Sequence, residues 1–211
     1  MTGAANALSR FAEWGIASRP AAREIRSGDA HVMLPTADGF LAAVVDGLGH
    51  GPAAEDAAVR VTATLREHAD EAVTQLMQLC HQALRRTRGA VLSLVSVSAD
   101  SGAMTWLGVG NVEVNLFRAA PTATQRREQL VLRGGVVGYE LPSLREQVLP
   151  IVHGDVLVLV TDGISSGFTA RSPLGCEPQV YADEILAEWA KSYDDALVLA
   201  VRYIGGRTST A

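Results

Sequence analysis

Cysteine and histidine are scarce in this chain, which has two cysteines and five histidines in 211 residues. Cys80 and Cys176 lie far apart and outside any CxxC spacing. A disulfide framework and a zinc knuckle are therefore excluded. We expect both thiols to be packing residues.

Basic charge and long apolar runs are also missing. The formal net charge is −5, and the one dense basic cluster, residues 85–88, is short, whereas nucleic-acid binding requires a broad basic surface. No apolar run approaches the roughly 20 residues of a membrane helix, and the N-terminus lacks the layout of a signal peptide. We expect a cytoplasmic protein with neither a nucleic-acid nor a membrane partner.

No linker rich in proline, glycine or serine divides the chain, and no repeat of fixed period occurs. The polar stretch 121–128 is interpreted as a loop. Apolar residues make up 48% and charged residues 19%, which is typical of a folded globular protein. Residues 1–211 are predicted to form a single domain.

Most of the chain has the pattern of β-strands. Short apolar or alternating runs bounded by turn residues predict strands at 11–18, 31–34, 40–45, 90–98, 103–107, 112–118, 129–132, 147–149, 155–161 and 196–203. Helical spacing of apolar residues predicts one helix from Pro52, a second over 73–84 and a third over 182–191. Strands in runs with helices between them favour an α+β fold, with helices packed on a largely antiparallel sheet or sandwich.

Aspartates stand at the ends of several predicted strands. The stretch FLAAVVDGLGHG places Asp46 directly after a buried run, and DVLVLVTDG repeats the construction at Asp162. Asp29 precedes another strand, and the pair Asp194 and Asp195 precedes the last one. An unpaired charge at such a position is costly, so we expect these carboxylates to meet a cation.

Carboxylates that converge repel one another and stay ionised only when cations neutralise them. An oxygen-only donor set suits Mg²⁺ or Mn²⁺ rather than zinc. Two such ions can activate a bridging water and clamp a phosphoryl group. The glycines after the two aspartates, Gly47 and Gly163, are expected to let the backbone approach the ions and turn away.

These residues, taken in order, resemble a known family. The segments SGD at 27–29, DGLGHG at 46–51, RGAVLSLV at 88–95, GDVLVLVTDG at 154–163 and DD at 194–195 are similar in order and spacing to the metal-dependent serine/threonine protein phosphatases (PPM). The similarity is strongest to the compact bacterial SpoIIE/RsbX-like branch, which acts in partner-switching stress signalling. It covers nearly the whole chain.

The resemblance implies a four-layer α/β/β/α sandwich with two Mn²⁺ or Mg²⁺ ions at one end of the paired sheets. Asp46 would bridge both ions, and the Gly47 carbonyl, Asp29, Asp162 and Asp194 would be further ligands. Asp194 is preferred to Asp195, whose contribution stays open. The implied substrate is phosphoserine or phosphothreonine in a stress-signalling regulator, hydrolysed by a metal-bridging hydroxide.

Two positions depart from the family pattern. Residues 108–111, GVGN, carry no acid where larger members have one that helps to hold a third metal. Leu197 replaces the threonine of the usual DDxT segment, which would loosen the support of Asp194. A third metal is therefore not expected.

Several other side chains are candidates for a role in the reaction. His50 has the chemistry of a general acid for the leaving serine oxygen, although it could equally be a polar loop residue. Arg19, Arg26 and Arg88 are candidates to hold the substrate phosphate, since a guanidinium matches its geometry. The alternative for each is an ordinary surface arginine.

Two other functions were weighed. GISSG at 163–167 matches the nucleophile elbow of a serine hydrolase, but no histidine follows it and no helix pattern begins at once, so we discard this interpretation. A catalytically weak phosphatase-fold protein that binds a phosphorylated signalling partner remains the alternative to the enzyme. Four acidic positions favour the enzyme, because a scaffold has no need to gather repelling charges.

Overall fold

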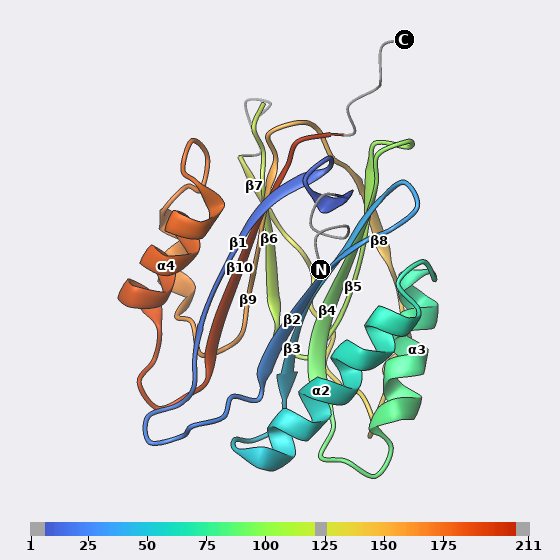
Figure 1. Cartoon of the computed structure of the whole chain (residues 1–211), viewed down its shortest axis with the longest axis vertical. Coiled ribbons are helices and arrows are strands. Elements are labelled where there is room, and N and C mark those ends of the chain that lie inside the picture. The colour runs from blue at the N-terminus through green and yellow to red at the C-terminus, as the bar shows by residue number, and fades with distance from the viewer. Residues whose placement is uncertain (1–6, 121–125, 206–211) are drawn as a thin grey trace.

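A computed structural model describes residues 7–120 and 126–205 of the chain (Figure 1). Of the loop expected at 121–128, residues 121–125 lie outside the described part, and Arg127 begins a short strand. The strands are β1 Ala12–Arg19, β2 Asp29–Pro35, β3 Gly39–Gly47, β4 Ala90–Ser98, β5 Ala103–Val109, β6 Glu113–Phe117, β7 Arg127–Gln129, β8 Gln147–Pro150, β9 Val156–Val160 and β10 Ala196–Tyr203. The helices are α2 Pro52–Glu67, α3 Val73–Leu84, the 3₁₀ helix η1 Ser166–Ala170 and α4 Pro178–Trp189.

The strands form two antiparallel sheets that face each other. One sheet has the order β1-β10-β9-β6-β7 and the other β2-β3-β4-β5-β8. Helix α4 covers the outer face of the first sheet, and α2 and α3 cover that of the second (Figure 1). The predicted α/β/β/α sandwich is confirmed.

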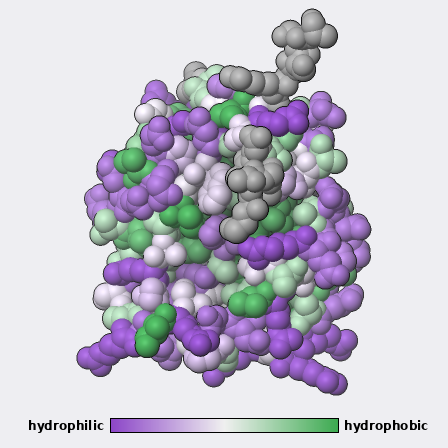
Figure 2. Space-filling model, viewed as in Figure 1, coloured by the Kyte–Doolittle hydropathy of each residue, from purple (hydrophilic) through white to green (hydrophobic). Residues whose placement is uncertain are grey.

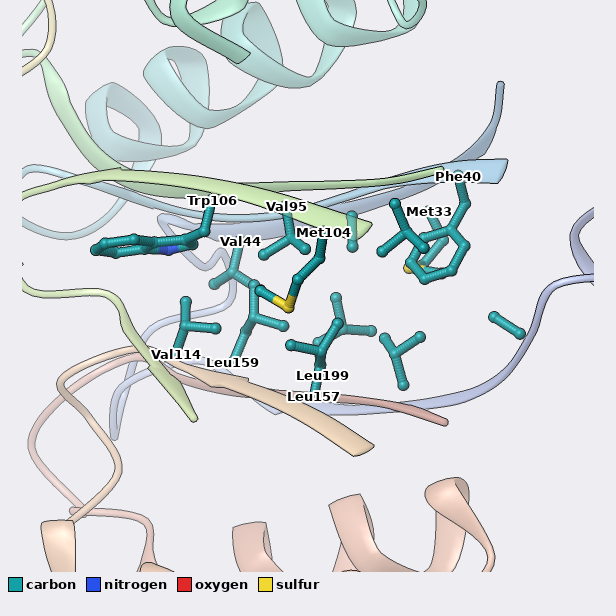
Figure 3. Packing of buried hydrophobic residues seen from close by; sticks show 14 of the residues in the cluster. Met33, Phe40, Val44, Val95, Met104, Trp106, Val114, Leu157, Leu159 and Leu199 are labelled. Carbon is teal, nitrogen blue, oxygen red and sulfur yellow. The ribbon is translucent and has the colours of Figure 1, made fainter. Parts of the chain in front are cut away.

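The two sheets are joined by an apolar core. Figure 3 shows Phe40, Val95, Met104 and Trp106 of one sheet pointing toward Leu159 and its neighbours on the other. Two further buried clusters fill the space under α2 and α3 and under α4. A strand whose residues contact both an opposite sheet and a helix is apolar on both faces, which explains the continuous apolar run of β3.

Two helix predictions are accurate and the third is wrong at its start. Pro52 is the first residue of α2, and α3 covers 73–84 as expected. The third helix begins at Pro178, four residues before the predicted start, and ends at Trp189. Proline at a first helical position signals this start, as it does for α2.

The strand predictions hold to within a few residues, with β4 and β10 matching fully. The run 129–132 is the clearest error, because β7 ends at Gln129, and Leu130 then packs into the core between the sheets. Both cysteines are unpaired thiols, and Cys80 lies in the core beneath α3. None of the helices in the described ranges is long and apolar enough to cross a membrane.

Candidate metal centre

The predicted aspartates come together at one end of the sandwich, the lower end in Figure 1, where β3 leads into α2. Asp29 is the first residue of β2 and lies directly opposite Asp46, near the end of β3. Asp162 follows β9, and Asp194 and Asp195 precede β10. Neighbouring antiparallel strands that start and end at this edge bring residues far apart in sequence into one place.

A pocket of about 570 Å³ opens at this edge. Its lining includes three of the aspartates and three other polar side chains: Asp46, Asp162, Asp194, His50, Asn111 and Tyr193. No ion pair among the described residues involves any of these aspartates or Asp29. The pocket is therefore acidic and has no cationic side chain paired with its carboxylates.

The carboxylates affect one another's protonation. Burial, followed by repulsion from Asp46 and other aspartates, raises the pKa of Asp29 to about 8. Burial, followed by repulsion from Asp162, Asp194 and Asp195, raises the pKa of Asp46 to about 7. Burial and then the charge of Asp162 also raise the pKa of Asp194. A carboxyl group that is disfavoured as an anion by burial and by like charge is stabilised in its ionised form by a bound cation.

Asp29 is held by a threonine that the sequence analysis did not single out. The Thr161 hydroxyl donates to Asp29 Oδ2 at 2.7 Å and accepts from the Leu197 backbone N–H at 2.9 Å. Leu197 itself points into the core between the sheets. The hydroxyl of the residue that follows β9 thus holds one of the clustered carboxylates. Its place immediately before the Asp-Gly pair was a signal available in the sequence.

Asp162 is oriented by the neighbouring loop. Asn111 Nδ2 donates to Asp162 Oδ2 at 2.7 Å, and Lys191 Nζ donates to the Asp162 backbone oxygen at 2.5 Å. Asn111 is the last residue of the GVGN segment that lacks an acid. An amide at this position binds the carboxylate, where a second acid would repel it.

The paired aspartates Asp194 and Asp195 have different surroundings. Asp195 is 4% exposed, and its two carboxylate oxygens accept the backbone N–H groups of Ala21 and Gly28, each at 2.7 Å. Asp194 lines the pocket, and the one hydrogen bond that its carboxylate accepts from the described residues comes from the N–H of Asp195, at 3.0 Å. The geometry therefore leaves Asp194 free for a ligand and uses Asp195 to hold the loop between β1 and β2.

Close packing explains the two glycines that follow aspartates. A Cβ on Gly47 would lie 2.2 Å from the Ala54 backbone oxygen of α2, and one on Gly163 would lie 1.8 Å from the Asp195 backbone oxygen. Neither glycine is among the residues with positive φ. These positions are glycine because another backbone passes against them, and the expected sharp turn comes two residues later, at Gly49 with φ 90°.

The donor set fits divalent magnesium or manganese. All the side chains involved offer oxygen, which hard cations prefer. Within residues 7–120 and 126–205, no three acidic, histidine or cysteine side chains are already spaced to hold one ion. Mg²⁺ is commonly bound by one or two carboxylates, with waters and substrate phosphate as its other ligands. A carboxylate-lined, open pocket matches that mode of binding.

The structure separates the three candidate arginines. Arg19 donates to the backbone oxygens of Ala190 and Lys191, and Arg26 pairs with Glu55 at 2.5 Å. Arg88 has no acceptor for its guanidinium among the described residues, and its Nη1 would lie 2.8 Å from a Cβ on Gly49, a residue that lines the pocket. Arg88 is therefore the arginine available to a phosphate there.

His50 lies on the pocket lining and contacts Glu24, with Nδ1 2.8 Å from Oε1. Its side chain is 73% exposed. The Glu24 carboxylate holds Nδ1, which leaves Nε2 available to other partners. This geometry permits a proton donor at the mouth of the pocket.

The serine-hydrolase pattern is not supported by its surroundings. Ser165 follows β9 and is succeeded by the five-residue 3₁₀ helix η1, whereas His153 precedes β9 at the other end of that strand. A nucleophile elbow needs a full helix and a histidine within hydrogen-bond reach. Ser165 instead lines a second hollow beside Asp162 and Lys191.

Comparison with known proteins agrees with this fold. The family model described as stage II sporulation protein E (SpoIIE) matches residues 36–203. The chain therefore belongs to the SpoIIE family, within the PPM phosphatase class that the sandwich and its acidic edge define. Asp29 lies outside the matched range but pairs with Asp46 inside it.

One curated relative is the phosphoserine phosphatase RsbX of Bacillus subtilis (strain 168). It is 31% identical over 85 residues, which are 40% of this chain and 43% of that protein. The match thus spans less than half of the relative's length.

Solved structures resemble nearly the whole chain. A protein described with the bacterial stressosome has a TM-score of 0.82 at 29% identity, covering 90% of this chain and 99% of that one. RsbX in complex with magnesium has a TM-score of 0.79 at 18% identity, covering 92% and 96%. The Mycobacterium tuberculosis phosphatase PstP has a TM-score of 0.71 at 14% identity, covering 92% and 99%. The last two establish the shared fold.

Proposed function

We propose that this protein is a Mn²⁺- or Mg²⁺-dependent serine/threonine protein phosphatase that acts on a phosphorylated regulator in bacterial stress or partner-switching signalling, in the cytoplasm. The observation that carries the proposal is the set of aspartates at one edge of the sandwich, with Asp46, Asp162 and Asp194 lining one pocket. The phosphoserine phosphatase RsbX and the stressosome protein among its relatives support the choice of substrate and pathway.

In this proposal the aspartates hold two ions. Asp46 would contribute to both, with Asp29, Asp162, Asp194 and the Gly47 carbonyl as further ligands. Bound divalent ions supply an activated water as nucleophile and neutralise the charge that develops on the phosphoryl oxygens. Thr161 and Asn111 hold two of the carboxylates in place for this task.

Other residues of the chain would act on the substrate directly. The Arg88 guanidinium would hold phosphoryl oxygens at the pocket mouth, because it pairs with no acceptor among the described residues. His50, oriented by Glu24, would donate a proton to the serine or threonine oxygen as the bond between phosphorus and that oxygen breaks. The products are inorganic phosphate and the free hydroxyl.

The alternative is a phosphatase-fold protein that binds a phosphorylated partner without efficient chemistry. The raised pKa values of Asp29 and Asp46 speak against it, because a carboxylate cluster destabilises a scaffold that binds no ions. A measurement of catalytic turnover distinguishes the two proposals, because the phosphatase releases phosphate from its substrate and the binding protein does not.

The test is hydrolysis of an aryl phosphate and of a phosphoserine peptide, with Mn²⁺, with Mg²⁺ and with a chelator. We expect metal-dependent release of phosphate that is abolished by chelator and by Asp46→Ala. Calorimetric titration of Mn²⁺ should show two binding events per chain that weaken in the variant. A protein that binds the phosphopeptide but releases no phosphate with either metal would establish the scaffold.

A further inference from the structure

Two loops lie side by side at the mouth of the acidic pocket. We define them as the mouth loops, residues 20–28 between β1 and β2 and residues 190–195 before β10. Hydrogen bonds connect the two loops. The Ala22 N–H donates to the Ser192 backbone oxygen at 3.1 Å, and the Ala21 and Gly28 N–H groups donate to the Asp195 carboxylate, each at 2.7 Å. The guanidinium of Arg19, just before the first loop, donates to the Lys191 backbone oxygen at 2.8 Å. The mouth loops therefore form one fixed unit.

Each mouth loop exposes one large apolar side chain. Ile25 is 96% exposed and Tyr193 is 75% exposed. Single exposed apolar residues are common, and Figure 2 shows several scattered among hydrophilic ones on the face in view. Tyr193 differs from most of them in its position, because it lines the pocket together with Asp46, Asp162 and Asp194.

Two of the three charged side chains of the first mouth loop are already paired. Glu24 contacts His50, and Arg26 contacts Glu55. Paired charges of opposite sign give little net attraction for a charged partner. The third, Arg23, is exposed and takes part in no ion pair among the described residues. Ile25 stands between the two pairs in sequence, so apolar contact is the interaction that this position offers.

The backbone around Ile25 is held in an unusual conformation. Arg23 has a φ of 77°, which is rare for a residue other than glycine, and the Glu24 N–H closes a turn on Ala21 O at 3.0 Å. A backbone fixed in this way presents Ile25 at little entropic cost to binding. Tyr193 needs only two side-chain torsions to be ordered.

We propose that Tyr193, together with Ile25, contacts the polypeptide on either side of the phosphorylated residue, so that the enzyme prefers apolar residues flanking its phosphoserine or phosphothreonine. This inference rests on the proposed phosphatase function. The occupant is a polypeptide rather than a small phosphate ester, because Tyr193 lines the pocket whereas Ile25 is not among its lining residues, so a substrate that contacts both must extend beyond the pocket.

The experiment compares three substrates: an aryl phosphate, a phosphoserine peptide flanked by leucines, and the same peptide flanked by asparagines. Tyr193→Ala is expected to raise KM for the leucine peptide about five- to tenfold, as truncation of an aromatic contact residue does. The asparagine peptide should respond less, so the preference for the leucine peptide, measured as the ratio of the two kcat/KM values, should fall by a similar factor. Ile25→Ala should act in the same direction with a smaller effect.

Val148→Ala is the control, because Val148 is exposed on strand β8, outside the mouth loops. It should change none of the three reactions. Equal effects of Tyr193→Ala on all three substrates, or no effect on the peptides, would overturn this inference and leave the phosphatase proposal intact. An enzyme inert toward every substrate would overturn both.

Discussion

Asp29 and Asp46 lie directly opposite each other in the antiparallel pairing of β2 with β3. Like charges in this cross-strand position destabilise a sheet, and both carboxyl groups have raised pKa values. Burial is the larger cause of both raised pKa values and repulsion between the aspartates is the next, so a divalent cation bound at this pair would favour the ionised carboxylates that the protein alone disfavours.

Asp46→Asn should abolish phosphatase activity and leave the metal-free fold as stable as before or more stable. The substitution removes one charge from the repelling group, so we expect the melting temperature in chelator to hold or rise. Addition of Mn²⁺ should raise the melting temperature of the wild type much more than that of the variant, because binding stabilises the native state by mass action.

Asp56→Asn is a matched control for this change, because Asp56 is an exposed residue of α2 that pairs only with Arg60. It should keep both the activity and the response to Mn²⁺. A large loss of metal-free stability in Asp46→Asn would show that the carboxylate has a structural role instead.

The metal-free protein should lose stability as the pH rises. The pKa values of Asp29 and Asp46 are about 8 and about 7 in the folded state, against an ordinary value of 3.8. The folded state therefore holds more protons than the unfolded state between these values, and the stabilisation present below pH 3.8 is lost as the pH passes 7 to 8. Each proton held contributes a slope of up to about 1.4 kcal/mol per pH unit.

Urea unfolding in chelator at pH 5.5, 7 and 8.5 measures this slope. Saturating Mn²⁺ should flatten it, because a bound ion keeps the carboxylates ionised. Metal-free stability that rises over the same range would contradict the proposed clustering of the two acids.

Thr161→Val should destabilise the protein and disturb the pocket. It removes the donor to Asp29 and leaves the buried Leu197 N–H without its acceptor, a loss of roughly 1–3 kcal/mol. Thr161→Ser keeps the hydroxyl and should retain most of the stability and the Mn²⁺ affinity. If valine and serine behaved alike in calorimetry, the hydroxyl would have no such role.

Asp194→Ala and Asp195→Ala should have different effects, the first on Mn²⁺ binding and the second on the stability of the fold. Asp195 accepts two backbone N–H groups in a buried position, so its loss should lower the free energy of unfolding by about 2–4 kcal/mol. The Asp194 variant should keep its metal-free stability and lose Mn²⁺ affinity. Reversed results in chemical unfolding and Mn²⁺ titration would assign the ligand to Asp195.

Arg88→Ala should raise KM for phosphorylated substrates about tenfold if its guanidinium holds phosphate, a typical cost for a charge-assisted contact. Arg26→Ala is the control, since Arg26 is already paired with Glu55. Steady-state kinetics with the aryl phosphate measures both. Equal KM values for the two variants would show that Arg88 does not bind the substrate phosphate.

Much of the architecture was predictable because it depends on local patterns. The apolar run before Asp46, the same run before Asp162 and the helical stripe after Pro52 all formed the elements they indicated. The start of α4 was missed although Pro178 signals it. The roles of Thr161 and Asn111 depend on hydrogen bonds to residues that are distant in sequence, and neither had been assigned a role at this site.

From the sequence alone, the pattern of strands and helices predicted an α+β fold, and the aspartates at strand ends predicted a site for a hard divalent ion, because periodicity and charge are local properties of the chain. Only the tertiary structure decided which carboxylates face the pocket. Adjacent aspartates such as Asp194 and Asp195 take opposite roles because the backbone N–H groups of a loop some 170 residues earlier in the chain bind one of them and leave the other open.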